Sequence, residues 1–378
     1  IGAAALALGQ IFVGSCHSAV SALLLATLLE RGEEALGKSS HTRFICLGLG
    51  LLYLSQREAA ETTLDALMAV PEAVGKYATL TVQSCAYACS GNVLEVQSML
   101  QLCGEHPGAE GSSSHQAVAV LGIAMVAMGE ELGSHMAVRT LGHLLQYGDP
   151  AIRRAVPLAV AMLSLSRPQV TTIDKLSKLS HDTDAEVAQN AIFALGLIGA
   201  GTNNAKIALL LRQLSSYYYK DPNHLFVVRV AQGLVHLGKG LLTLSPFTGG
   251  GMLCNRVALA GILATMHAFF DIKNTILGKH HYLLYHLVLA MRPGFMMALD
   301  SDLKLLPVSV RVGQAVDTVG QAGKPKTITG FQTHTSPVLL AAGERVELVS
   351  EEYLPMTDLL EGFVILKPNP DYKQPSAQ

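Results

Sequence analysis

The chain has 378 residues, which is enough for two or three domains. Half of the residues are hydrophobic and only 15% are charged, which indicates a surface that is largely apolar or covered by partners. A net charge of -2 gives no electrostatic basis for binding nucleic acid or an anionic membrane, and the longest apolar stretch, 257–270, is too short to span a bilayer.

The first residue is Ile1 rather than Met, and the basic start of a signal peptide is missing, so we expect a fragment without a secretory leader. Six cysteines lie mostly in apolar helical stretches. This placement predicts reduced thiols in the cytoplasm and nucleus, and not a secreted disulfide framework.

Small residues recur along residues 1–240 with a period of 35 to 41 residues. The positions that set the period are Gly9, Gly50, Ala86, Ala124, Ala161, Gly196 and Gly233. Each has Gly, Ala or Ser two residues before it and Gly or Ser five residues after it. A fixed period of this length predicts stacked helical hairpins, whose small residues permit close helix approach and whose terminal Gly or Ser ends the helix.

The second helix of each predicted hairpin is amphipathic, as in 59–70, 94–102, 136–147 and 205–214. In the first of these, Glu58, Glu61 and Asp65 share the face opposite Leu64 and Leu67. Such an acidic stripe is most often a solvated surface, and a partner-binding face is the alternative.

The period fades after Gly240, and residues 241–300 are expected to form terminal helices that include 256–270 and 282–291. Alternating and β-branched segments follow at 308–312, 327–329, 346–349 and 363–366, the last as a buried strand. Residues 301–368 are therefore predicted to form a β-rich domain, and the polar, Pro-rich tail 369–378 is predicted to be disordered.

The motifs that would indicate nucleotide binding, metal binding or catalysis are incomplete in this sequence. Residues 233–240 approach a nucleotide-binding P-loop, but Gly240 stands where the Ser or Thr is needed and no strand precedes the loop. Cys85 and Cys89 lack a second pair of zinc ligands, and the histidines at 280, 281 and 286 lack an acidic companion. We expect no metal, no cofactor and no enzymatic activity.

Three segments resemble proteasome/cyclosome repeats: 3–16, 117–125 and 199–204. Leu306 to Asp317 (Leu-Pro-Val-Ser-Val-Arg-Val-Gly-Gln-Ala-Val-Asp) and Gly323 to Thr335 (Gly-Lys-Pro-Lys-Thr-Ile-Thr-Gly-Phe-Gln-Thr-His-Thr) resemble the C-terminal domain of one family. That family is non-ATPase subunit 2 of the proteasome regulatory particle, a scaffold of its base. The resemblance covers essentially the whole chain.

The resemblance implies a closed α-helical toroid completed by residues 241–300, with small-residue helices inside and amphipathic helices outside. It also implies docking on the proteasomal ATPase ring and on other regulatory-particle subunits. A further implication is the binding of ubiquitin, or of the ubiquitin-like domains of shuttle factors or of a deubiquitinase, through acidic residues on outer helices. The candidate residues for that binding are Glu30, Glu33, Glu34, Glu58, Glu61 and Asp65.

The chain departs from the expected receptor pattern in the helix after Cys16. Ala19 and Ala26 stand where acidic or polar residues are expected, which predicts weaker ubiquitin binding without affecting a scaffold role. The alternative function is that of a HEAT-like helical-repeat adaptor or transport receptor outside the proteasome. Such proteins form open superhelices with larger residues where this chain has Gly and Ala.

Overall fold

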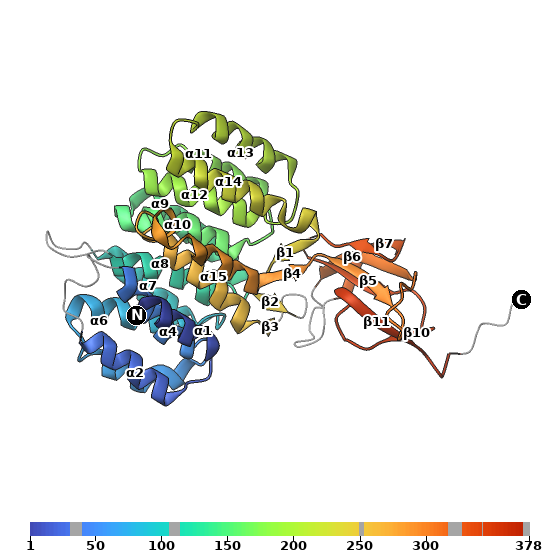
Figure 1. The fold of residues 1–378 in the computed structure, drawn as a ribbon, viewed down its shortest axis with the longest axis horizontal. Coiled ribbons are helices and arrows are strands. Elements are labelled where there is room, and N and C mark those ends of the chain that lie inside the picture. Colours follow the sequence, from blue (N-terminus) through green and yellow to red (C-terminus); the bar gives the residue numbers. More distant parts are fainter. Residues whose placement is uncertain (31–39, 106–113, 249–252, 317–326, 342, 373–378) are drawn as a thin grey trace, which may run out of the picture.

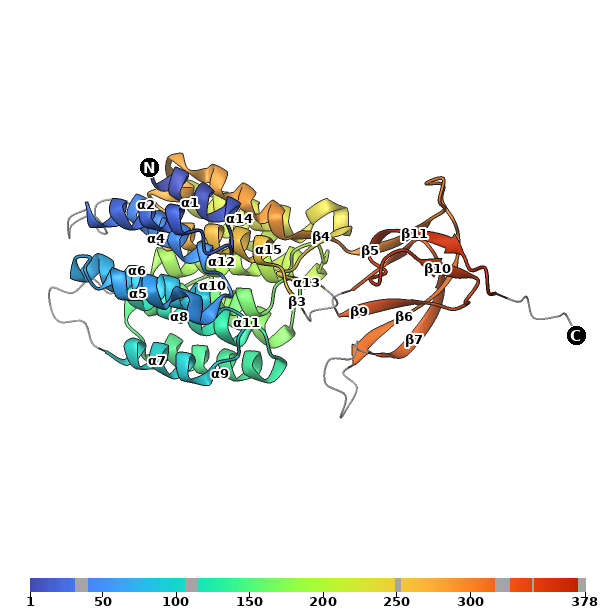
Figure 2. The ribbon, with the colours of Figure 1, turned by 90° about the horizontal axis from the view of Figure 1, so that it is seen from below.

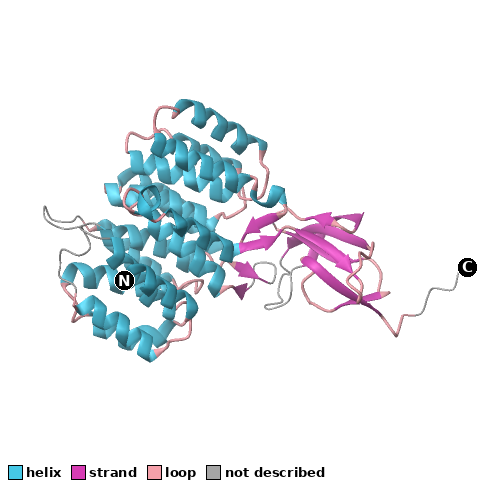
Figure 3. Ribbon diagram, in the orientation of Figure 1, coloured by secondary structure: helices cyan, strands magenta, loops and turns pink. Residues whose placement is uncertain are grey.

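The computed structural model describes residues 1–30, 40–105, 114–248, 253–316, 327–341 and 343–372. Helical repeats occupy one end of the molecule and small β-sheets the other (Figure 1). Figure 3 shows this division between helices and strands. A helical-repeat region followed by a β-rich region, as predicted from the sequence, is therefore confirmed.

Seven inner helices contain the small-residue positions and pack in order, each against the next. They are α1 (Gly2–Ile11), α4 (Ser40–Leu52), α6 (Glu72–Ala86), α8 (Ser114–Ala127), α10 (Pro150–Leu163), α12 (Ala185–Ile198) and α14 (Pro222–Val235). α8 and α12 are apolar almost throughout and are buried along their length, as expected of helices covered on every side.

Outer helices form a second layer (Figure 2). They are α2 (Ser18–Leu29), the short η1 (Arg57–Ala60) with α5 (Glu61–Leu67), α7 (Val93–Gly104), α9 (Glu131–Tyr147), α11 (Val170–Leu179) and α13 (Ala205–Tyr217). In the described part of the chain, no helix is both long and apolar enough to cross a membrane.

Because glycine has no side chain, the backbones of neighbouring inner helices come into close contact, as the repeat pattern predicts. A Cβ atom added at Gly196 would lie 2.7 Å from the Cα of Ala231 on the next inner helix. Gly233 is different, because nothing lies within 4 Å of its Cβ position. This helix is the last of the stack, so the close contact predicted at Gly233 is missing.

A turn residue that follows the end of the inner helix by three to five positions links five of the repeats to the next one. Of the seven predicted positions, six have a positive φ: Gly14, Ser55, Gly91, Ser166, Gly201 and Gly238. Because the chain turns there, the N–H of Gly14 donates to the carbonyl of Leu51 (2.9 Å), and that of Gly201 donates to the carbonyl of Leu234 (2.9 Å). Equivalent bonds join Ser55 to Cys85, Gly91 to Val126 and Ser166 to Leu197.

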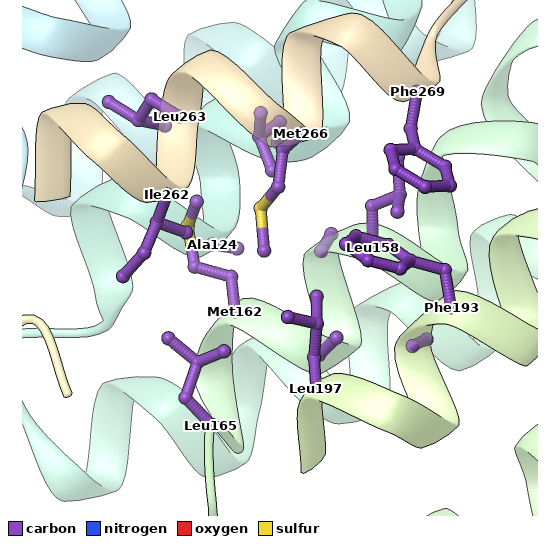
Figure 4. Close-up of a cluster of buried hydrophobic side chains, with 14 of the residues drawn as sticks. Ala124, Leu158, Met162, Leu165, Phe193, Leu197, Ile262, Leu263, Met266 and Phe269 are labelled. Atoms are coloured by element: carbon purple, nitrogen blue, oxygen red, sulfur yellow. The ribbon is translucent and has the colours of Figure 1, made fainter. Parts of the chain in front are cut away.

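α15 (Arg256–Phe269) packs on the inner side of this arc, and all twelve residues from Ala258 to Phe269 are buried. Its Met266 and Phe269 point at side chains of α10 and α12 (Figure 4). The ring of Phe269 stacks on that of Phe193, with centroids 3.8 Å apart. At the opposite end of the arc, the guanidinium of Arg43 donates to the carbonyl of Phe270 (3.5 Å). The arc thus wraps around α15, and closure into a toroid stays a prediction.

Residues 241–300 differ from the expected set of helices. Three short strands, β1 (Leu242–Leu244), β2 (Phe247–Thr248) and β3 (Leu253–Cys254), precede α15. After it come the π-turn η3 (Thr275–Lys279) and the 3₁₀ helix η4 (His281–Ala290), where an α-helix over 282–291 was expected. Strands β4 (Met291–Pro293) and β5 (Phe295–Leu299) then begin the β-rich region before residue 301. β5 is apolar on both faces, so it lacks the alternation that marks a strand in the sequence.

The β-rich region consists mainly of two sheets around one core. Strands β6 (Ser309–Val316), β7 (Thr327–Thr335) and β9 (Glu344–Leu348) form the sheet β7-β6-β9. Strands β8 (Val338–Leu339), β10 (Tyr353–Pro355) and β11 (Gly362–Pro368) form with β5 the sheet β10-β11-β5-β8. The strand predicted over 363–366 is confirmed as part of β11. Its burial alternates, however, so Val364 and Leu366 enter the core while Phe363 is 66% exposed, and the expectation of a buried strand holds for one face only.

Candidate functional site

Three of the predicted acidic residues, Glu58, Glu61 and Asp65, are exposed on η1 and α5. Buried residues of α5, Thr63 and Leu67, fix the helix on the core and turn Glu61 and Asp65 outward. Glu58 is exposed on the preceding turn η1. The helical spacing read from the sequence is therefore confirmed for these three carboxylates.

A chain of buried hydroxyl groups sets the position of α5 against its neighbours. Thr63 donates to the phenol oxygen of Tyr53 (2.6 Å), and that phenol donates to Ser21 of α2 (2.9 Å). Since buried hydroxyl groups without partners are costly, this chain of bonds favours one arrangement of α2, α4 and α5.

A fourth carboxylate, Glu95, joins the acidic residues from the next outer helix. It lies in the first turn of α7, which Asn92 caps by accepting a bond from the N–H of Leu94 (3.0 Å). Its carboxylate accepts from the amide of Gln83 (2.6 Å). Burial, together with the negative charges of Glu95, Glu61 and Glu58, raises the pKa of Tyr87. Carboxylates from two outer helices therefore act on the same phenol.

Exposed apolar side chains lie on α7, at the end of α5 and on α2. Leu94 of α7 is 73% exposed, Met68 directly after α5 is 82% exposed and Leu23 of α2 is 54% exposed. We call the surface formed by Glu58, Glu61, Asp65, Glu95, Leu23, Met68 and Leu94 the acidic outer face. Exposed apolar residues with charged neighbours are typical of a protein-binding surface.

The other predicted site residues are less well placed. Glu30 is exposed at the C-terminal end of α2. Glu33 and Glu34 lie outside the described residues. Ala19 and Ala26 are both exposed on α2, so this helix offers apolar area where carboxylates were expected. Glu95 is not among the residues predicted from the sequence, although the Asn92-x-x-Glu95 spacing is that of a helix N-terminus.

The weak chemical motifs have structural roles. Gly233 lies inside α14, and Gly238 ends the repeat with a φ of 54°. The Cys89 thiol makes its hydrogen bond with Cys254, which raises the pKa of Cys89 and lowers that of Cys254. His286 pairs with Gln10 of α1 across 3.0 Å. Within the described ranges, no group of three or more His, Cys, Asp or Glu side chains is arranged to hold a metal ion.

Comparison with known proteins gives the class of this fold. A family model described as the proteasome/cyclosome repeat matches residues 190–222, which include the C-terminal part of α12 and all of α13. A second model, described as the C-terminal part of 26S proteasome non-ATPase regulatory subunit RPN1, matches residues 319–372 in the β-rich region. The helical part is therefore a proteasome/cyclosome repeat array.

Similarity to whole relatives extends along nearly all of the chain. It is 59% identical over 371 residues to "26S proteasome non-ATPase regulatory subunit 2 homolog A" of Arabidopsis thaliana, covering 98% of this chain and 41% of the relative. It is 56% identical to "26S proteasome non-ATPase regulatory subunit 2" of Dictyostelium discoideum, covering 98% of this chain and 41% of that protein. The "26S proteasome regulatory subunit rpn-1" of Neurospora crassa is 52% identical, with 98% and 42% covered.

The chain belongs to the family of 26S proteasome non-ATPase regulatory subunit 2, also called RPN1. It spans about two fifths of the length of the curated relatives that it matches (41% for the first two).

Proposed function

We propose that the protein is a non-catalytic scaffold in the base of the proteasome regulatory particle. In this proposal it docks on the ATPase ring and positions ubiquitin, or ubiquitin-like domains of shuttle factors or of a deubiquitinase, for regulated degradation. Support for the scaffold role comes from the names of the relatives, which are regulatory and non-ATPase subunits, and from the rigid inter-repeat bonding. The location that follows from this role is the cytoplasm and nucleus.

The acidic outer face supports the second part of the proposal. Ubiquitin folds present a basic surface with an apolar centre, and this face offers the complementary chemistry. Exposed carboxylates of Glu58, Glu61 and Asp65 lie along η1 and α5, and the exposed apolar Met68 follows directly after α5. With Ala19 and Ala26 apolar, the acidic contribution is expected from η1, α5 and α7 and not from α2. No observation favours the transport-receptor alternative.

Titration of labelled ubiquitin, or of a labelled ubiquitin-like domain, with the chain tests the acidic outer face by NMR. We expect the double variant Glu58→Lys/Glu61→Lys to weaken binding by about tenfold, because exposed charge pairs contribute about 0.2–1 kcal/mol each and reversal adds repulsion. The matched control is Glu131→Lys/Asp302→Lys, which changes the net charge equally at exposed sites elsewhere. Equal weakening by both variants would contradict a specific role for this face.

Docking on the ATPase ring needs a separate test. A tagged chain expressed in cells is expected to co-purify with ATPase subunits of the regulatory particle at 150 mM salt. The Glu58→Lys/Glu61→Lys variant should still do so, since the acidic outer face is proposed for ubiquitin binding only. Absence of ATPase subunits from the purified material would count against the scaffold role in the base.

A further inference from the structure

A groove of about 610 Å³ lies in the β-rich region, far along the chain from the acidic outer face. Residues of β9 and β10 and of the loop 358–361 line it. These two strands belong to different sheets, and Figure 2 shows the sheets as separate layers. Each strand is the last one of its sheet, so the groove runs between two sheet edges.

The wall formed by β9 has main-chain groups that its own sheet does not use. The N–H of Val349 donates to the carbonyl of Ser309 (3.1 Å), and the register pairs Leu348 with Val310. In an antiparallel pair, alternate residues bond to the partner strand, so the N–H and C=O groups of Val346 and Leu348 point away from β6. Neither residue has a backbone bond outside the sheet to any other described residue.

The opposite wall, formed by β10, offers fewer free main-chain groups for pairing with another strand. The N–H of Met356 donates to the carbonyl of Ile365 (3.0 Å), which directs Leu354 towards β11 and leaves Tyr353 on the open side. Pro355 has no N–H to offer. An extended segment entering the groove would therefore pair with β9 and cover β10 with its side chains.

The charge of the groove indicates which kind of extended segment it can bind. Four carboxylates line it, from Glu347, Glu351, Asp358 and Glu361, against the single guanidinium of Arg345. Glu361 is bound to Arg292 (3.1 Å), and Glu347 lies opposite Arg311 in the sheet. Glu351 and Asp358 are exposed and form no ion pair with any described residue. The groove therefore carries uncompensated negative charge.

The floor of the groove is apolar. Leu348, Tyr353 and Leu360 are half-buried against the core of the β-rich region, and Leu354 is 49% exposed beside them. An extended chain presents alternate side chains on opposite sides, so one set can meet this floor while the other set meets the carboxylates. The volume is within the range of about 300–1,000 Å³ that is usual for ligand sites.

We propose that this groove binds an extended basic segment of another protein, in which Lys or Arg alternates with aliphatic residues, by adding it as a strand to the open edge of β9. Val346 and Leu348 provide the main-chain bonds, Leu348 and Tyr353 receive the aliphatic side chains, and Glu351 and Asp358 bind the basic ones.

Fluorescence anisotropy with the labelled peptide Lys-Val-Lys-Leu-Lys-Val-Lys tests the proposal on the full chain. We expect saturable binding, about tenfold weaker for Glu351→Lys/Asp358→Lys, and none for the peptide with Glu in place of Lys. As a matched control, the single variant Glu352→Lys is compared with the single variant Glu351→Lys. Glu352 is exposed and adjacent to Glu351 but does not line the groove. Equal losses from these two single variants would show non-specific attraction and overturn the proposal.

Hydrogen exchange with and without the peptide distinguishes strand addition from a purely electrostatic contact. Segment 344–348 is expected to exchange more slowly in the complex, because the open N–H groups of β9 become bonded. Unchanged exchange there, with binding intact, would overturn the strand-addition geometry. Self-association of the chain that Glu351→Lys abolishes, together with no binding of the peptide, would overturn the proposal and assign the groove to a second copy instead.

Discussion

At the scale of single residues, the helix stack depends on the absence of a β-carbon where two backbones meet. Gly196 and Gly233 occupy equivalent positions in consecutive repeats, yet only Gly196 has a neighbouring backbone against it. The same residue type at the same position in the repeat therefore has two different energetic roles. This difference provides a direct test of close packing.

We expect Gly196→Ala to lower the free energy of unfolding by about 1–3 kcal/mol, because its Cβ meets the Cα of Ala231 at 2.7 Å and the helices must separate. Gly233→Ala has free space and lies inside a helix, so it should raise the stability by about 0.5–1 kcal/mol. Urea unfolding followed by circular dichroism measures both. Destabilisation by both substitutions to the same extent would contradict this account of close packing.

At the scale of the element, α15 carries apolar residues on every side. The length of this apolar stretch predicts a buried helix, and the structure places it along the inner side of the arc. Its buried ionisable group, His267, is 3% exposed, and burial together with the charge of Arg43 lowers its pKa to about 3. The imidazole is therefore neutral in the folded chain.

The buried histidine makes stability depend on pH. In the unfolded chain His267 binds a proton below about pH 6.5, whereas in the folded chain it does so only near pH 3. Stability is therefore lost as the pH falls between these values, by about 2 kcal/mol between pH 7.5 and 5. His267→Gln should remove that part of the loss, and His135→Gln, at an exposed site, should not. Identical pH profiles for wild type and His267→Gln would contradict the assignment.

At the scale of the whole molecule, the β-rich region has a hydrophobic cluster of its own. Val364, Met296 and Val310 belong to this cluster, which contains no residue of the helical repeats. The repeats have two further clusters, which together extend from Ala5 to Ala290. Because the two regions have separate cores, we expect a core substitution in one region to destabilise that region and not the other.

We expect Val364→Ala to accelerate hydrogen exchange in β5, β6 and β11 while exchange in α10 and α12 is unchanged. Ile192→Ala, which truncates a buried side chain of α12, should do the reverse. Each substitution removes buried methyl groups and is expected to cost about 1–4 kcal/mol in its own region. Mass spectrometry after exchange measures both, and uniform acceleration along the chain by either variant would indicate a single cooperative unit.

The sequence predicts the features that depend on spacing along the chain. The period of Gly, Ala and Ser predicts the stack, and the Gly or Ser predicted to end each inner helix adopts positive φ at six of seven places, although it lies three to five residues after the helix end. Gly129 is the exception, and nothing in its sequence distinguishes it from Gly91. The bond from each such residue to the next repeat, the position of α15 and the grouping of Glu95 with Glu61 depend on contacts between separate helices, which a single sequence does not encode as a pattern.

The main-chain hydrogen bonds that link neighbouring repeats run in one direction in the described residues: the N–H donor belongs to the earlier repeat and the carbonyl acceptor to the later one. During synthesis on the ribosome, the earlier repeat leaves the exit tunnel first and keeps an open N–H until its successor has folded. We therefore expect the array to grow in the direction of synthesis, with each of these open N–H groups offering a docking point for the hairpin that is translated next.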